Sequence, residues 1–182
     1  AKTMIKLIIL DVDGILTDGK KYYDARGNAV LKTFCDKDWT AIKRFRALGI
    51  PVVFLSGDRN INEAVLANRN LPAHFNRLGG QTTPKEFYIE SFKSMYGCTE
   101  EEMLYVGDDL FDIGIMRAVG HAYCTLDSPA AVKGVAHTLP VSGGDNVVMI
   151  LFDILENMSL IPYVPFSEIM PKIIELDQTE KF

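Results

Sequence analysis

Two aspartates at the end of an apolar run are the residues of this sequence best placed to do chemistry. Asp11 and Asp13 follow the uninterrupted apolar stretch 7–10, and alternation along an extended chain points both side chains in the same direction. Crowding two carboxylates together is costly unless a cation or a shared proton relieves their repulsion. The pair could therefore supply a nucleophile, an acid/base group and ligands for a hard divalent cation. The alternative is that both acids are simply solvated in an Asp-Gly loop.

Further polar groups follow apolar stretches, or open a helix, later in the chain. They are Ser56 and Gly57 after the run 50–55, Lys85 at the start of a predicted helix, and Asp108, Asp109 and Asp112 after the run 103–106. Because the carboxyl ends of parallel strands meet at one edge of a sheet, we expect these groups to lie with the first two aspartates. Phosphoryl transfer needs carboxylates that serve as a nucleophile and as ligands of Mg²⁺. It also needs groups that hold an anion, here a hydroxyl, backbone amides and an ammonium.

The elements that must position these groups alternate along the chain. Strands are predicted over 7–10, 50–55, 74–75, 103–106, 122–125 and 136–138, and helices over 39–48, 60–68, 83–97, 112–120 and 146–156. Residues 20–34 read as a β-hairpin with its turn at 24–28. Asp38 is a candidate N-cap for the first helix. The pattern predicts an α/β three-layer sandwich with a central parallel sheet.

The composition is that of an ordinary globular domain. The 182 residues are 48% hydrophobic and 24% charged, and the net charge is −5 with no basic run, which argues against a nucleic-acid partner. The apolar stretches are too short to span a bilayer, and the first residues lack the pattern of a secretory signal. The three cysteines are spaced for neither zinc nor a disulfide framework. We therefore expect a reduced, cytoplasmic protein with no membrane partner.

The order and spelling of the polar motifs resemble the haloacid dehalogenase (HAD) superfamily of phosphohydrolases. That superfamily has Asp-x-Asp first, a Ser or Thr at a strand end second, a Lys third, and an acidic Gly-Asp-Asp type of motif fourth. The corresponding residues here are Asp11-Val12-Asp13, Ser56-Gly57, Lys85 and Gly107-Asp108-Asp109 with Asp112. Each motif alone is weak, but four in the right order at strand ends and a helix start are specific.

The resemblance implies a role for each of these residues. Asp11 would attack phosphorus and form an aspartyl-phosphate, and Asp13 would act as acid and then as base. Asp11, the backbone carbonyl of Asp13, and Asp108 would bind Mg²⁺. Asp109 and Asp112 would hold metal-bound waters or position Lys85. Ser56, Gly57 and Lys85 would hold the phosphoryl oxygens. Ser56 and Asp109 could instead be helix N-caps.

The spacing between motifs narrows the resemblance to one branch. The intervals from Asp13 to Ser56 and from Ser56 to Lys85 are filled by predicted strands, helices and the hairpin, which leaves no room for a cap domain. The opening Asp-Val-Asp-Gly-Ile-Leu-Thr-Asp-Gly followed by a hairpin is similar to the capless (C0) phosphatases of KDO 8-phosphate and of nine-carbon keto-sugar acids. Members of that group are tetramers whose hairpins assemble the sites, so the resemblance implies a tetramer built through residues 20–34.

The sequence departs from this group at three places. Trp39 stands where the group has a glycine after the hairpin, and Asp58 stands where the second motif commonly has an arginine, which here moves to Arg59. We take Arg59, Trp39 and Lys32 as candidates for contact with the substrate, since arginine forks bind carboxylates well. We predict a phosphatase domain over 1–156, of which the resemblance covers roughly 6–156, and an extension over 157–182 that it does not cover. That extension is too apolar for a solvated tail, so we expect it to pack on the domain or on a neighbouring subunit.

We therefore predict a Mg²⁺-dependent phosphatase that acts on a small phosphorylated metabolite. The resemblance implies that this metabolite is a phosphorylated eight- or nine-carbon keto-sugar acid. A catalytically silent relative that binds a phosphorylated ligand or a protein partner is the alternative. The presence of Asp11, Asp13, Lys85 and Asp108 together argues against it, because a binding protein has no need of both aspartates in the first motif.

Overall fold

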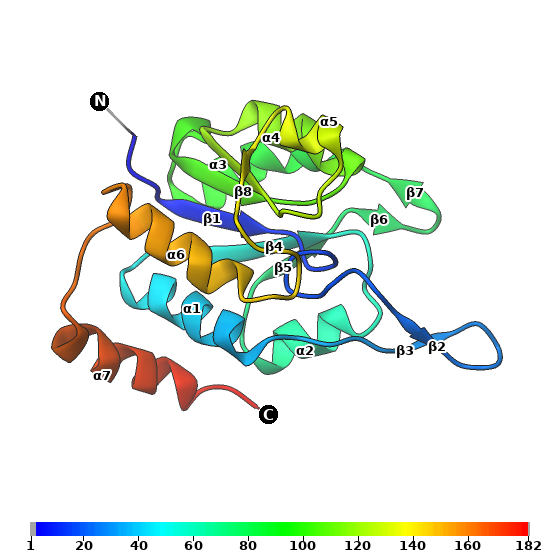
Figure 1. Ribbon diagram of the computed structural model, residues 1–182, viewed down its shortest axis with the longest axis horizontal. Coiled ribbons are helices and arrows are strands. Elements are labelled where there is room, and N and C mark those ends of the chain that lie inside the picture. The colour runs from blue at the N-terminus through cyan, green and yellow to red at the C-terminus, as the bar shows by residue number, and fades with distance from the viewer. Residues whose placement is uncertain (1–2, 182) are drawn as a thin grey trace.

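A six-stranded parallel sheet forms the centre of the computed structural model, which describes residues 3–181 (Figure 1). The strand order is β10-β9-β8-β1-β4-β5, and every neighbouring pair runs parallel. The strands are β1 (Leu7–Leu10), β4 (Val52–Ser56), β5 (Ala73–Phe75), β8 (Met103–Val106), β9 (His121–Cys124) and β10 (His137–Thr138). The predicted α/β class with a parallel sheet is confirmed. No segment of residues 3–181 forms a separate cap domain.

Helices cover both faces of this sheet, as Figure 1 shows. They are α1 (Asp36–Ala47), α2 (Asn62–Asn68), α3 (Ile89–Tyr96), α4 (Ile113–Ala118), α5 (Ala130–Lys133), α6 (Val147–Asn157) and α7 (Phe166–Asp177), with short 3₁₀ turns at Lys85–Tyr88, Glu100–Glu102 and Leu110–Asp112. α1 and α6 pack on one face, and α3 and α4 pack on the other. No helix in this part of the chain is long and apolar enough to cross a membrane.

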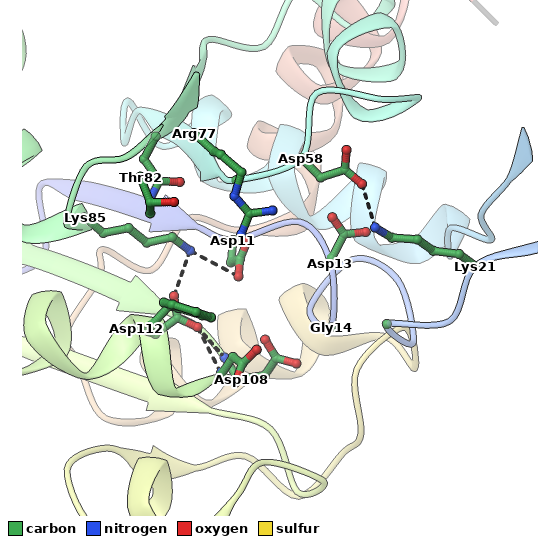
Figure 2. Close-up of a pocket in the computed structure, with 15 residues that line it drawn as sticks. Asp11, Asp13, Gly14, Lys21, Asp58, Arg77, Thr82, Lys85, Asp108 and Asp112 are labelled. Carbon is green, nitrogen blue, oxygen red and sulfur yellow. Dashed lines mark hydrogen bonds and ion pairs between the residues drawn. The ribbon is translucent and has the colours of Figure 1, made fainter. Parts of the chain in front are cut away.

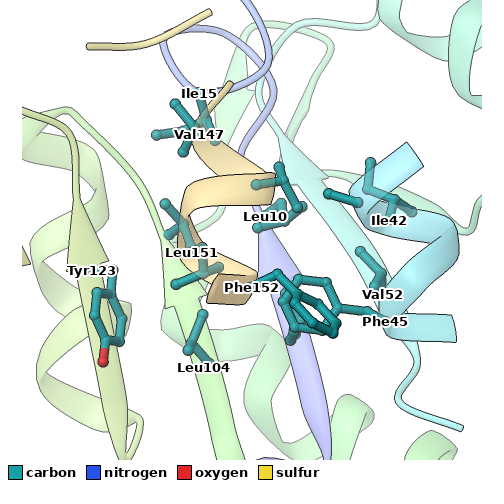
Figure 3. Packing of buried hydrophobic residues seen from close by; sticks show 14 of the residues in the cluster. Leu10, Ile15, Ile42, Phe45, Val52, Leu104, Tyr123, Val147, Leu151 and Phe152 are labelled. Carbon is teal, nitrogen blue, oxygen red and sulfur yellow. The ribbon is translucent and has the colours of Figure 1, made fainter. Parts of the chain in front are cut away.

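The two faces of β1 feed two separate hydrophobic cores, which explains why its sequence is continuously apolar. Ile8 and Leu10 pack with α1 and α6, where Phe45 and Phe152 lie 4.8 Å apart between ring centroids (Figure 3). Leu7 and Ile9 point to the opposite face and pack with α3 and α4. A strand that is buried on both faces needs an apolar side chain at every position. Its position is therefore fixed from both sides, and so is that of the residues that follow it.

Two antiparallel ribbons project from the carboxyl edge of the sheet. The predicted hairpin is confirmed as β2 (Tyr22–Tyr23) and β3 (Ala29–Leu31), which extend well away from the body of the domain (Figure 1). The second ribbon, β6 (Arg77–Leu78) and β7 (Gln81–Thr82), turns through Gly79 and Gly80. The sequence analysis missed this second ribbon because two-residue strands leave almost no periodic signal.

Asp38 does not cap α1, and that prediction is wrong. It lies inside the helix with 1% of its surface exposed, and its Oδ1 accepts a hydrogen bond of 2.9 Å from the amide of Val148 in the first turn of α6. Asp38 therefore caps a helix more than a hundred residues away. Burial raises the pKa of its carboxyl to about 7.

The extension 157–182 contains α7, a helix that the sequence analysis did not predict. Pro171 lies inside it, and an interior proline normally ends or kinks a helix, so this proline, with Pro162 and Pro165, conceals the helix in the sequence. Its Ile169 and Ile173 are buried, and the helix packs along the outside of α1 (Figure 1). Residues 1, 2 and 182, which the predicted domain boundaries include, lie outside the described residues.

A buried ion-pair cluster fastens the end of this extension to the domain. Glu180, with 3% of its side chain exposed, lies 2.9 Å from Nζ of Lys43 and 3.1 Å from Nη1 of Arg69. The guanidinium of Arg69 also lies over the ring of Trp39, 4.2 Å from its centroid. Asp177 contributes a second carboxylate, 2.9 Å from Lys43, but half of its side chain remains exposed.

Glu180→Ala should lower the free energy of unfolding by about 3 kcal/mol, because it removes a buried carboxylate from ion pairs with both Lys43 and Arg69. Asp177→Ala is the matched control, since it removes a carboxylate from the same lysine at an exposed position where a pair contributes less than about 1 kcal/mol. Urea unfolding of both variants and the wild type measures the difference. Equal effects of the two substitutions would contradict the assignment of the cluster to Glu180.

Candidate active site

A cavity of about 300 Å³ opens at the carboxyl edge of the sheet, where the predicted groups meet (Figure 2). Its lining comes from the loops after β1, β4 and β8, from the start of the hairpin, and from the second ribbon. The lining residues are Asp11, Asp13, Gly14, Gly19, Lys21, Gly57, Asp58, Asn76, Arg77, Thr82, Lys85, Asp108, Asp109, Phe111 and Asp112. Most of the residues singled out in the sequence are therefore brought together.

Lys85 lies at the bottom of this cavity and is held by two aspartates. Its Nζ is 3.2 Å from Asp11 and 2.7 Å from Asp112, and it donates a 2.9 Å hydrogen bond to the hydroxyl of Tyr105. Only 5% of the lysine is exposed. Burial alone would lower its pKa, but the charges of Asp11 and Asp112 outweigh burial and raise it. Lys85 is therefore a fixed positive charge beside Asp11.

Asp112 receives four hydrogen bonds and has no oxygen left for a ligand. Its Oδ1 accepts from Lys85 and from Tyr105, and its Oδ2 accepts from the amides of Asp108 and Asp109 at 2.9 and 3.0 Å. A carboxylate offers about four lone-pair directions, so this one is saturated. Asp112 therefore orients the lysine and the acidic loop.

Asp11 and Asp108 are the carboxylates left to hold a cation. One oxygen of each, and one of the saturated Asp112, lie within 4.8 Å of one another. Burial, with repulsion between the acids, raises the pKa of Asp11 to about 7 against the opposing charge of Lys85, and that of Asp108 to about 8. A divalent cation would relieve this repulsion, so the residues present fit Mg²⁺, which prefers oxygen ligands.

Gly14 makes this approach of the acids possible. Its φ is +83°, and a Cβ at this position would lie 1.8 Å from Oδ2 of Asp108. Any side chain here would displace the Asp108 carboxylate and strain the backbone.

Asp13 lines the same cavity as Asp11 and contacts the stem of the hairpin. Its two oxygens lie 2.8 Å from Nζ of Lys32 and 2.9 Å from Nδ2 of Asn62. The Lys32 side chain is completely buried, and its ammonium is also 3.0 Å from Asp58. Lys32, which the sequence analysis offered for substrate contact, is thus committed to protein carboxylates and holds Asp13 in place.

Asp58, the acid that departs from the family pattern, pairs with two lysines of the hairpin. Asp58 lies 2.8 Å from Lys21 at one end of the hairpin (Figure 2). It also lies 3.0 Å from Lys32 at the other end. Partial burial would raise its pKa, but these two lysines lower it to about 2. Asp58 therefore ties both strands of the hairpin to the loop after β4.

The second motif is split between two environments. Ser56 is 1% exposed and its Oγ accepts from the amide of Asp58 at 3.3 Å, whereas Gly57 lines the cavity. Asp109 caps the 3₁₀ turn Leu110–Asp112, which is the alternative that the sequence left open for it. Phosphoryl contact by Ser56 and Gly57 stays a prediction.

Two substrate-binding predictions do not fit the structure. Trp39 is 5% exposed, stacks on Phe34 at 5.6 Å between centroids and lies under Arg69, so it belongs to the core. Arg59 pairs with Glu63 at 3.1 Å and lies over the ring of Phe75, outside the cavity lining. Trp39 lies in α1, four residues after Cys35. At this position of the helix, its large ring faces the hydrophobic interior rather than the site.

Several lining or supporting residues were missed. Arg77, Asn76 and Thr82 come from the unpredicted second ribbon, Asn62 contacts Asp13, and Tyr105 contacts Lys85. Tyr105 was identified only as part of a buried strand. A tyrosine with one polar atom in such a strand needs a hydrogen-bond partner, and that requirement could have pointed to the site.

Comparison with known proteins found relatives along most of the chain, although no family model matches it. The 3-deoxy-D-manno-octulosonate 8-phosphate phosphatase KdsC of Haemophilus influenzae is 35% identical over 153 residues, which cover 83% of this chain and 82% of that protein. The cobalt-bound structure of the Haemophilus influenzae phosphatase superposes with a TM-score of 0.75 at 34% identity, covering 85% of this chain and 86% of that one. The same phosphatase from Moraxella catarrhalis, in complex with magnesium, phosphate and KDO, shares the fold at 24% identity, with a TM-score of 0.73 and coverage of 84% and 86%.

Magnesium should stabilise this protein more at pH 8 than at pH 5.5. The folded-state pKa values of Asp11 and Asp108, about 7 and about 8, lie above the ordinary 3.8. At pH values between 3.8 and these folded-state pKa values, the metal-free folded state binds more protons than the unfolded state. The stability of the folded state therefore falls as the pH rises. Magnesium binds the deprotonated acids and offsets that loss.

Thermal unfolding with chelator and with magnesium, at both pH values, measures this effect. Asp108→Asn is the matched control, which should show a flatter pH dependence and lose the magnesium response. A magnesium shift in the melting temperature that is equal at both pH values, or that survives in Asp108→Asn, would contradict the assignment.

Proposed function

The chain belongs to the 3-deoxy-D-manno-octulosonate 8-phosphate phosphatases, a family of the HAD superfamily. We therefore propose that it hydrolyses a phosphomonoester of a small metabolite. The substrate class is a phosphorylated eight- or nine-carbon keto-sugar acid. The observation that carries this proposal is the position of Asp11, which directly follows β1. It lies 3.2 Å from Nζ of Lys85 and close to the carboxylate of Asp108. A carboxylate flanked by a fixed cation and a cation-binding acid is suited to approach a phosphate dianion.

The reaction divides into two displacements at phosphorus. A carboxylate oxygen of Asp11 attacks phosphorus, the bond from phosphorus to the ester oxygen breaks, and Asp13 gives its proton to the departing alcohol. Asp13 then takes a proton from water, whose oxygen attacks the aspartyl-phosphate and releases phosphate and free Asp11. Lys32 and Asn62 hold Asp13 for both steps. The amide of Gly57, the hydroxyl of Ser56 and the ammonium of Lys85 would hold the phosphoryl oxygens.

Asp11, the carbonyl of Asp13, and Asp108 would hold Mg²⁺, which supplies charge for the phosphoryl oxygens. The cobalt-bound form of the Haemophilus influenzae relative supports a divalent cation at this site. Asp109 and Asp112 would act around it, Asp112 through the four hydrogen bonds described above. We also place the protein in the cytoplasm, in keeping with its free cysteines, Cys35, Cys98 and Cys124.

The hairpin β2–β3 is the proposed contact between subunits of a homotetramer. It exposes apolar residues that its own domain does not cover: Tyr22, Tyr23 and Leu31 each expose about 60% of their surface (59%, 63% and 60%). Contiguous exposed apolar side chains on an extended element favour burial against another chain. The proposed partners are therefore a small phosphorylated metabolite and further copies of this chain.

Purified protein should release phosphate from KDO 8-phosphate and a nine-carbon keto-sugar acid phosphate faster than from neutral sugar phosphates or an aryl phosphate. Release should require magnesium and stop with chelator. Asp11→Asn should lower turnover by more than about 10³-fold with the fold intact, because it removes the nucleophile. Folded wild-type protein that releases nothing from this panel would favour the binding alternative, and an active Asp11→Asn variant would displace Asp11 as nucleophile.

Leu31→Arg should reduce the sedimentation coefficient from that of a tetramer toward that of a monomer, because it places a charge in the proposed contact. Met95→Arg, at an exposed apolar site on α3, is the control and should leave the assembly unchanged. A wild-type monomer at micromolar concentration would exclude the hairpin contact.

A further inference from the structure

Arg77 is the cationic residue of the cavity that pairs with no carboxylate among the described residues. Three cationic residues line the cavity, among six aspartates. Lys85 is held by Asp11 and Asp112, and Lys21 is held by Asp58. Within residues 3–181, the Arg77 guanidinium has no ion pair or hydrogen bond. A cation without a counter-charge in an acidic cavity is free to bind an anion from outside.

The position of Arg77 points to the part of the substrate that it would contact. Figure 2 shows its guanidinium directed into the cavity above Asp11. A Cβ placed on Gly57 would lie 3.6 Å from Nη2 of Arg77, so the guanidinium lies beside the backbone proposed to hold phosphoryl oxygens. The donors of Arg77, Gly57 and Lys85 therefore surround the same part of the cavity.

The second ribbon is fixed at its base, which limits where Arg77 can reach. The amide of Asn76 donates to the carbonyl of Ser56 at 3.1 Å, the amide of Thr83 donates to the carbonyl of Asn76 at 2.7 Å, and Nδ2 of Asn76 donates to the carbonyl of Thr83 at 2.8 Å. Asn76 is 5% exposed, and its Oδ1 is buried without a donor. Arg77, the next residue, thus starts from an anchored point at the end of β4.

We propose that Arg77 is a further substrate-binding residue, whose guanidinium holds oxygens of the phosphoryl group opposite Lys85. This inference rests on the proposed function and adds a residue that no motif of the sequence identified. Lys85 is already paired with Asp11 and Asp112, so Arg77 supplies the protein charge that is available to the incoming dianion. Its planar fork can bind two phosphoryl oxygens at once.

Arg77→Ala should lower kcat/KM about 10- to 100-fold, the loss expected for hydrogen bonds to a charged group. The loss should be similar for the keto-sugar acid phosphate and for the aryl phosphate, because both carry the phosphoryl group. Arg77→Lys, which keeps the charge without the fork, should lose less. Arg117→Ala is the control, since it removes an equal charge from an exposed position on α4 outside the cavity.

Calorimetric titration with inorganic phosphate, in magnesium buffer, gives a readout that does not need turnover. Phosphate should bind about 10- to 100-fold more weakly to Arg77→Ala than to the wild type. A loss confined to the substrate with a carboxylate, with phosphate affinity unchanged, would overturn the phosphoryl assignment. So would unchanged kinetics and unchanged phosphate binding in a folded variant.

The two proposals fail in different ways. If the wild type hydrolyses none of the phosphate esters, the proposed function fails, and the phosphate titration alone decides the role of Arg77. If the wild type is active and Arg77→Ala matches it in both measurements, the function stands and Arg77 is excluded.

Discussion

The repulsion between carboxylates at the end of β1 is the constraint on which the rest of the site depends. Asp11, Asp108 and Asp112 are held together by a strand buried on both faces, by Gly14 and by a lysine at the bottom of the cavity. Folding places these acids close together although they repel one another, and the packing of two cores bears that cost. The cavity therefore attracts cations, and a phosphate dianion can enter only where positive charge has been supplied.

The hairpin and the site are connected through charge rather than through hydrophobic packing. Lys21 and Lys32 lie at the two ends of the hairpin, and both contact Asp58, while Lys32 also contacts Asp13. The acid in place of the usual arginine therefore compensates for two lysines. An arginine at that position would face both of them, so the substitution and the pair of lysines form one arrangement.

Much of the fold could be predicted because the buried strands have an unambiguous signal. The runs before Asp11, Ser56 and Asp108 are apolar at every position, so both the strands and the edge where they end could be recognised. Arg77 and α7 could not, because two-residue strands have no period and Pro171 conceals a helix that tertiary packing supports. Nor could the sequence show that Lys32 is buried or that Asp38 caps α6, because each effect depends on a residue distant in the chain.

The cluster around Glu180 also sets an order for folding during synthesis. Lys43, Arg69 and Trp39 emerge early, yet the carboxylate that pairs with both cations lies 137 positions after Lys43. Domains begin to fold while the chain is still being made, so a nascent chain that has completed the sheet still lacks the ion pairs that Glu180 makes with Lys43 and Arg69. Until the segment around Glu180 has been translated, neither the packing of α7 on α1 nor these ion pairs can stabilise the domain.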